Sequence, residues 1–248
     1  MGNPRVLRGL PRRLSPEVRP AKAGRPQRPP WRGGPSPKAR PPDATRPPDA
    51  AAMERAVAVF LEAAGLDMAS DPNLARTPRR VAEAWMNDFL DGYRTTPEEA
   101  LGKRYPVPPA PPGVGELVVV TDLRFHSMCP HHLLPYQGRA HLAYVPSGGV
   151  VGFGRLAALL DCFAHRLILQ EALAREVAQA LVQVLGSPGA ACVLEAEQFC
   201  LRIRGGTRCD AVTHSEAYEG TLRDGPDLRR ELWARIQRPA RRARGGKR

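Results

Sequence analysis

The hexapeptide Ser127-Met128-Cys129-Pro130-His131-His132 restricts the possible folds of this chain more than any other stretch. It places one thiol and two imidazoles within four consecutive residues, and a second thiol, Cys200, follows far along the chain. If these groups bind one metal ion, the fold must bring the two stretches together. The alternative interpretation is a buried cysteine beside two histidines that hydrogen-bond within the protein.

Two cysteines and one histidine would give three protein ligands and leave a fourth position open. That arrangement is typical of catalytic rather than structural zinc sites. Water in the open position becomes acidic enough to supply hydroxide near neutral pH. Adjacent histidines cannot both reach the same ion comfortably, so we expect one to bind the metal. The other then remains free as a general acid or base.

The net charge of +12 is concentrated at the two ends of the chain. Residues 1–50 have a net charge of +9, residues 238–248 have +6, and the part between them has −3. Residues 1–52 are rich in Pro and Arg, so we predict a disordered basic tail, with a second basic tail at 238–248. Basic ends can bind nucleic acid, but no motif supports that here, and we expect solvated tails without such a partner. Met53 lies at the beginning of the first segment with apolar periodicity. It is therefore an alternative start of the chain.

The chain has no run of about 18 apolar residues, which predicts no transmembrane helix and no membrane partner. Its N-terminus lacks the apolar segment of a secretory signal. The five cysteines form no close-set disulfide pattern, and we interpret them as ligands or small buried groups of a cytoplasmic protein.

Apolar periodicity predicts an N-terminal helical region over residues 53–105. Residues at helical spacing over 51–66 are Val57, Phe60, Leu61 and Ala64. Thr77-Pro78 offers an N-cap hydroxyl and a first-turn proline, and Gly92 suits the residue that follows a helix end. We expect these helices to form a packing layer.

Strand and helix signals alternate through the predicted main domain, residues 106–237. Strand signals cover 116–123, 138–145, 190–205 and 212–222, and helical patterns cover 156–167, 170–185 and 228–236. A hairpin, two helices and a second hairpin predict an α+β domain. In this domain an antiparallel sheet is backed by two helices.

The stretch 190–205 is predicted to be one long strand or two joined strands. Because side chains alternate along a strand, one face would carry a thiol, an amide and two guanidinium groups. These belong to Gln198, Cys200, Arg202 and Arg204. The opposite face would carry apolar residues that suit a core. A polar face of this kind favours a functional site at Cys200.

Six motifs of the chain, spread over residues 53–236, resemble the GTP cyclohydrolase I family. They are Thr77-Pro78-x-Arg80-Val81-Ala82, Ser127-Met128-Cys129-x-His131-His132-Leu133-x-Pro135, Gly138-x-x-His141-x-Ala143-Tyr144-x-Pro146, Val151-Gly152-Phe153, Arg166-Leu167-x-x-Gln170-Glu171 and Cys200-x-x-x-Arg204-Gly205. The resemblance implies the tunnelling fold for residues 106–237. It also implies a homo-oligomer, usually a decamer of two stacked pentamers, with active sites at subunit interfaces.

The resemblance implies hydrolysis of GTP to 7,8-dihydroneopterin triphosphate and formate, at the entry to pterin and tetrahydrofolate synthesis. Cys129, His132 and Cys200 correspond to the zinc ligands of the family. His131 corresponds to the proton donor to N7 of guanine. Gln198 stands at the position of a second catalytic histidine.

The resemblance also implies which residues bind GTP. Glu171, with Gln170, would contact the guanine edge, because a carboxylate can accept from N1–H and the 2-amino group. Arg155 and Arg204 would hold triphosphate oxygens through charge-assisted hydrogen bonds.

The chain departs from the family pattern at four of these positions. Glutamine at 198 cannot exchange a proton near pH 7 as histidine does. Gly154 replaces a serine, Ala158 an arginine and Pro130 a glutamate. The departures motivate two alternatives to an active GTP cyclohydrolase I. One is a divergent paralogue with truncated or altered purine ring opening, and the other is a catalytically silent nucleotide-binding subunit.

Overall fold

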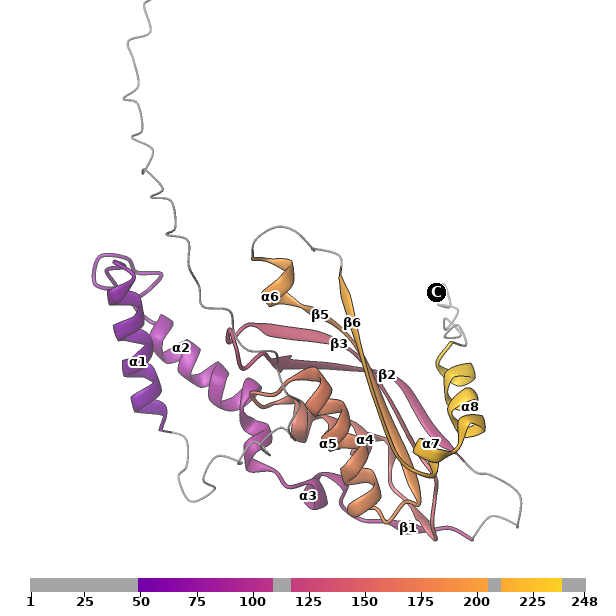
Figure 1. Cartoon of the computed structure of the whole chain (residues 1–248). Helices are drawn as coiled ribbons and strands as arrows, with labels where there is room; N and C mark the ends of the chain where they lie inside the picture. The colour runs from indigo at the N-terminus through magenta and orange to yellow at the C-terminus, as the bar shows by residue number, and fades with distance from the viewer. Residues whose placement is uncertain (1–48, 109–116, 205–210, 238–248) are drawn as a thin grey trace, which may run out of the picture. The chain divides into compact units, whose positions relative to one another are not determined.

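The computed structural model describes residues 49–108, 117–204 and 211–237 (Figure 1). The two predicted basic tails lie almost wholly outside the described residues. The described part has the predicted α+β organisation, with helices at its start, a four-stranded antiparallel sheet and two long helices between the hairpins.

The N-terminal region is helical, as predicted. Helix α1 spans Ala50–Ala63 and begins where Asp49 accepts a hydrogen bond from the Ala52 N–H at 2.9 Å. Helix α2 spans Thr77–Ala84 and continues as the π-helix η1, Trp85–Phe89. The 3-10 helix η2, Asp91–Arg94, and helix α3, Pro97–Leu101, complete the region.

Two local predictions in this region are wrong. The N-cap of α2 is Arg76, and the Thr77 hydroxyl donates instead to the Asn73 carbonyl. Gly92 lies inside η2, where a Cβ would come within 2.7 Å of the Cys162 carbonyl oxygen, so close packing rather than helix termination requires glycine. Phe60 lies in the predicted helix, but it is 70% exposed and does not belong to the core.

The main sheet has the strand order β2-β3-β5-β6, with every neighbouring pair antiparallel. The strands are β2 (Val118–Met128), β3 (Pro135–Tyr144), β5 (Gly189–Gln198) and β6 (Val212–Gly220). A separate ribbon pairs β1 (Tyr105–Pro106) with β4 (Gly149–Val150). Each hairpin of the main sheet therefore joins strands that are adjacent in space.

Helices cover the sheet on both faces. Helices α4 (Phe153–Ala164) and α5 (Gln170–Gln183) pack on one face through fully buried leucines, including Leu156, Leu159 and Leu173. Replacing one of these leucines by alanine costs about 2–5 kcal/mol. The short helix α7 (Thr221–Asp224) and helix α8 (Pro226–Ile236) form a smaller core on the other face with Leu222 and Leu232.

The prediction of a strand through 190–205 is wrong in its second half. Strand β5 ends at Gln198, and residues Phe199–Arg202 form the short helix α6. The pairing of β5 with β3 ends at Gln198 and its pairing with β6 ends at Glu197, so the following backbone has no partner strand. It satisfies its hydrogen bonds locally, with the Ile203 N–H donating to the Phe199 carbonyl.

The sheet has two ends that matter for function. We call the end formed by Met128, Pro135 and Gln198 the cysteine end, and the end formed by Val118, Tyr144 and Ala190 the opposite end. Helix α4 begins beside β4 at the opposite end, and the connection to α5 reaches the cysteine end through a bridge between Met128 and Leu167. β2 alone, with 11 residues, separates the ends by about 33 Å.

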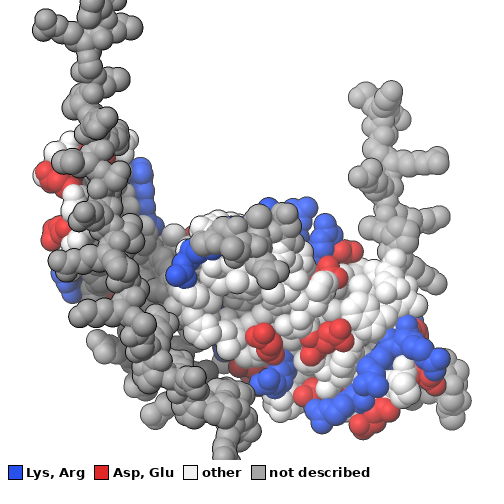
Figure 2. All heavy atoms as spheres, turned by 45° about the horizontal axis from the view of Figure 1, so that its top comes forward, with Lys and Arg blue, Asp and Glu red and all other residues white. Residues whose placement is uncertain are grey.

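Among the described helices, none is both long and apolar enough to cross a membrane. Figure 2 shows one face of the molecule, on which acidic and basic side chains are interspersed rather than sorted into a continuous basic stripe.

Candidate metal centre

The β2–β3 connection is a tight turn that presents Cys129 and His132 on the same side. The Cys129 N–H donates to the Leu134 carbonyl and the Leu133 N–H donates to the Cys129 carbonyl, both at 2.9 Å. Leu133 has a φ of 53°, a left-handed conformation that is uncommon for leucine. The turn therefore fixes the spacing of the two side chains through its own backbone.

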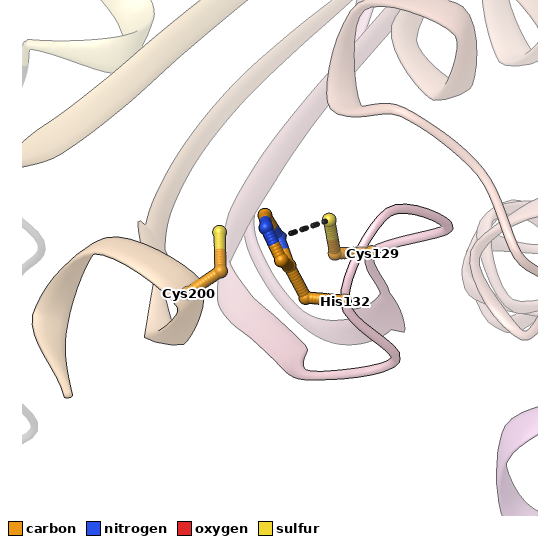
Figure 3. Close-up of side chains that lie close together, drawn as sticks. All are labelled: Cys129, His132 and Cys200. Atoms are coloured by element: carbon orange, nitrogen blue, oxygen red, sulfur yellow. Dashed lines mark hydrogen bonds between the residues drawn. The ribbon is translucent and has the colours of Figure 1, made fainter. Parts of the chain in front are cut away.

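Cys200 reaches the same place from α6. The potential ligand atoms of Cys129, His132 and Cys200 all lie within 4.8 Å of one another (Figure 3). The Cys129 Sγ and His132 Nδ1 atoms are 3.9 Å apart. Cys129 is buried, Cys200 is half-buried and His132 is exposed, so the cluster opens to solvent on the histidine side.

The three side chains fit a zinc ion. Thiolate and imidazole are the ligands that zinc prefers in proteins. Tetrahedral zinc lies about 2.3 Å from sulfur and about 2.0 Å from nitrogen, which sets its ligand atoms about 3.5–3.8 Å apart. Closing the cluster from its present spacing needs shifts of about 1 Å or less. The open side leaves room for a fourth ligand.

Burial and the neighbouring Cys129 thiol raise the pKa of Cys200, and nearby Arg204 acts in the opposite direction. Two thiols held this close resist losing both protons, because the second thiolate would face the first. A divalent cation between them removes that repulsion, since metal-bound cysteines are deprotonated. The cluster therefore favours a cation over two free thiolates.

The connection between α4 and α5 places the start of α5 beside the cluster. The Ile168 N–H donates to the Met128 carbonyl at 3.3 Å, and the Tyr136 hydroxyl donates to the Ile168 carbonyl at 3.0 Å. Burial, above all, raises the pKa of Tyr136, and the charges of Glu171 and Cys129 add to the effect. Glu171 and Cys129 therefore lie around the same tyrosine, and Glu171 is exposed.

Gln170 is committed to contacts within the protein. Its side chain is 4% exposed, and its amide nitrogen donates to the carbonyls of Leu194 and Thr213. Its amide oxygen accepts from the Gln198 amide at 2.8 Å and from the Thr213 hydroxyl at 2.6 Å. All four hydrogen-bonding positions of this amide are thus occupied. Glu171, rather than Gln170, is the side chain free to face a substrate.

Thr213 is a member of this network that the sequence analysis did not identify. It lies on β6 opposite Ala196, and its hydroxyl also lies 3.0 Å from the Ala196 carbonyl. The only available signal was its place in the strand that pairs with 190–198, because a lone threonine belongs to no motif. The network ties Gln198 to the first residue of α5.

His131 is exposed beside the cluster. Its ring centroid lies 6.2 Å from that of His132, and the two ring planes are nearly perpendicular at 80°. Of the two histidines, His132 has a ring nitrogen within the cluster of potential ligand atoms, whereas His131 does not belong to that cluster. One can serve as a ligand while the other remains available to a substrate.

The predicted phosphate-binding residues separate into two places. Arg204 is exposed and lies close enough to Cys200 to influence its pKa. Arg155 lies in the first turn of α4, at the opposite end of the sheet. Within a single chain, the structure therefore brings together the three predicted ligands, His131, Gln198, Glu171 and Arg204, but not Arg155.

The chain is similar to known proteins over most of its length. The family model described as GTP cyclohydrolase I matches residues 53–237. A GTP cyclohydrolase 1 of Chromobacterium violaceum is 42% identical over 200 residues, which cover 80% of this chain and 94% of the relative. A GTP cyclohydrolase 1 of Ralstonia nicotianae is 39% identical, covering 74% of this chain and 85% of the relative. One of Streptococcus sanguinis is 38% identical, covering 73% and 95%.

Proposed function

The chain belongs to the GTP cyclohydrolase I family, and we propose that it hydrolyses GTP to 7,8-dihydroneopterin triphosphate and formate in the cytoplasm. The observation that carries this proposal is the convergence of Cys129, His132 and Cys200 from two distant stretches of the chain. Zinc, when bound by these residues, supplies a Lewis acid that makes a coordinated water nucleophilic near neutral pH.

His131 is the proton donor in this proposal. It is exposed next to His132 and has no part in holding the metal, so it can give a proton to N7 of the guanine ring. Histidine suits this step because its ordinary pKa lies close to the operating pH. Protonation at N7 makes C8 more electrophilic and favours attack there.

Glu171 orients the guanine base. Its exposed carboxylate at the start of α5 can accept hydrogen bonds from N1–H and the 2-amino group. Gln170 and Thr213 act indirectly, because their hydrogen bonds hold the start of α5 against β5 and β6. Arg204 lies near Cys200, is exposed and can pair with phosphate oxygens.

The position of Arg155 supports a homo-oligomer with shared sites. About 33 Å of strand separates the two ends of the sheet, which is longer than a nucleoside triphosphate. If Arg155 binds the phosphates of GTP, the base and the metal must belong to a second copy of the chain. We infer an assembly in which the opposite end of one chain meets the cysteine end of another, and the family's decamer is the assembly we expect.

Gln198 favours a second candidate, a divergent enzyme that opens the purine ring but does not complete the pterin. The amide of Gln198 donates to Gln170 and cannot exchange a proton near pH 7. Later steps that need a second acid–base group would then be slow. A silent nucleotide-binding subunit is the third candidate, but it would have no chemical need for an open metal site.

One experiment separates the three candidates. The purified full-length protein, loaded with zinc, is incubated with GTP while formate and pterin fluorescence are both followed. Formate together with fluorescence supports the proposed activity. Formate without fluorescence supports the truncated reaction, and GTP binding without formate supports the silent subunit.

A further inference from the structure

A cavity lies at the opposite end of the sheet. It has a volume of about 300 Å³ and is lined by residues of the α3–β1 connection, β1 and the first turns of α4. These residues are Lys103, Tyr105, Gly152, Gly154, Arg155 and Ala158. The lining contains two cations and no carboxylate, so the cavity favours an anion.

The two cations come from neighbouring walls of the cavity. Gly102 has a φ of 59°, and a Cβ at this position would lie 3.3 Å from the Cζ atom of Arg155. The Arg155 guanidinium therefore packs against the residue that precedes Lys103. The Lys103 ammonium lies over the Tyr105 ring, 5.8 Å from its centroid, and both residues line the cavity.

Neither cation is neutralised by the described part of the protein. The ion pairs formed by described residues include neither Lys103 nor Arg155. The neighbouring Arg104 is different, because its guanidinium donates to the Ser147 carbonyl at 2.8 Å. Two cations that line one cavity without an acid both attract a bound anion, which interacts with both charges at once.

The start of α4 adds backbone donors to the same cavity. The helix has 12 residues, and its N-cap, Gly152, provides no side chain to cap it. The first N–H groups of a helix lack intrahelical partners and favour anions. A Cβ added at Gly152 or Gly154 would meet no atom within 4 Å, so the side-chain space at both glycines is open.

We propose that Lys103 binds the phosphate chain of the nucleotide and that it replaces the arginine which the family carries at the position of Ala158. This inference rests on the proposed function. Ala158 and Lys103 line the same cavity from different walls, so a cation lost from α4 is supplied from the α3–β1 connection. The nucleotide is the one whose base lies at the metal centre of a second copy. Lys103 is thus a substrate-binding residue that the family motifs do not contain.

The test compares Lys103→Gln with the parent chain and with Arg230→Gln, a matched loss of one exposed positive charge on α8. Affinities for GTP, guanosine and inorganic tripolyphosphate are measured by calorimetry on the full-length protein. We expect Lys103→Gln to weaken GTP and tripolyphosphate binding about 5- to 20-fold and to leave guanosine unchanged. Arg230→Gln should match the parent for all three probes. Equal tripolyphosphate affinities of Lys103→Gln and the parent would overturn the inference.

Two further variants distinguish charge recognition from a structural role. Lys103→Arg keeps the charge and should retain most of the affinity for tripolyphosphate, whereas a structural lysine would lose function in this variant as well. Adding Ala158→Arg to Lys103→Gln returns a cation to the same cavity and should restore binding. Failure of both variants to bind tripolyphosphate would contradict the inference.

The binding measurements do not depend on turnover, so the two proposals can fail separately. If the parent releases no formate but tripolyphosphate binding depends on Lys103, the proposed activity is wrong and the assignment of Lys103 to phosphate binding is supported. If the parent turns over GTP and Lys103→Gln has an unchanged KM for GTP, the assignment of Lys103 is wrong and the proposed activity is supported.

Discussion

The two ends of the main sheet differ in which residues expected of the family they have lost. The cysteine end departs from the family pattern at Pro130 and Gln198, but it keeps all three predicted ligands together with His131 and Glu171. At the opposite end, a serine and an arginine of the family pattern are replaced by Gly154 and Ala158. Both ends belong to one four-stranded sheet, so we relate the difference to what each end binds rather than to the fold.

The physical demands on the two ends explain this difference. A metal ion requires three ligand atoms to converge within a few ångströms, and no other residue can take over from a missing one. A phosphate chain presents several oxygens over a larger volume, and cations from different elements can satisfy them. Lys103 illustrates the second case, since it lines the cavity from outside α4. A binding site can therefore change its residues more freely than a metal centre can.

The largest effect should come from removing a ligand at the cysteine end. We expect Cys200→Ala to lower kcat/KM for GTP by at least about 10³-fold, because the remaining two ligands hold zinc poorly. Formate release and bound zinc are measured together. Cys192→Ala is the matched control, because Cys192 is a fully buried thiol away from the cluster. Normal formate release by Cys200→Ala would remove the contrast between the two ends.

His131 tests whether the cysteine end performs acid–base chemistry as well as metal binding. We expect His131→Gln to lower kcat about 10²–10⁴-fold while bound zinc is unchanged, because only proton transfer is lost. His214→Gln removes an exposed histidine of β6 and should leave kcat at the parental value. Loss of zinc from His131→Gln would mean that His131, rather than its neighbour, is the ligand.

Gln198 is the one departure from the family pattern that the cysteine end carries inside its hydrogen-bond network. Replacing it by histidine restores a group that can exchange a proton, and we expect formation of the fluorescent pterin to rise about 10-fold. Thr213→Val provides a comparison, since it disturbs the same network without adding an acid–base group. If Gln198→His is no faster than the parent, the amide at this position does not limit the reaction.

The smallest effect concerns His141, which lies on β3 between the two ends. Its Nδ1 accepts from the Asp122 N–H at 3.3 Å, and its Nε2 is buried without a partner among the described residues. Burial lowers the pKa of His141 from the ordinary value of 6.5, while Asp122 and Glu195 oppose the shift and Arg139 adds to it. As the pH falls, His141 is therefore protonated at a higher pH in the unfolded chain than in the folded protein.

The contribution of neutral, buried His141 to the free energy of unfolding is present above pH 6.5. It is lost as the pH falls below that value. Urea unfolding at pH 7.5 and pH 5.5 should show a smaller loss of stability for His141→Gln than for the parent. His214→Gln, which changes an exposed histidine, should keep the parental dependence. Equal pH dependence of the parent and His141→Gln would show that burial of His141 is not linked to folding.

The sequence predicted the fold well where side-chain patterns repeat. Helices α4 and α5 follow the apolar spacing of their leucines, and the strands follow alternation or β-branched runs. The same logic failed after Gln198, because strand β5 stops where its neighbours stop and no local pattern shows that limit. Cys200 reached the cluster all the same, on a short helix instead of a strand face.

The site was predictable only as a set of residue types. Motifs identified Cys129, His132 and Cys200, but they did not show that Gln170 is committed to Gln198 and Thr213. Those contacts depend on which strands pair, so they are long-range properties that spacing does not encode. Lys103 was not predicted for the same reason, because it lines the same cavity as Arg155 only in the folded chain.

The most direct test of the central claim is the coordination of zinc by the purified full-length protein, measured by X-ray absorption together with metal content. We predict about one zinc per chain, with two sulfur ligands at about 2.3 Å and a nitrogen ligand at about 2.0 Å. Cys129→Ala and Cys200→Ala should each remove one sulfur from the signal or abolish binding. Zinc bound without sulfur ligands, or an unchanged signal in both variants, would contradict the claim that these two cysteines and His132 hold one ion.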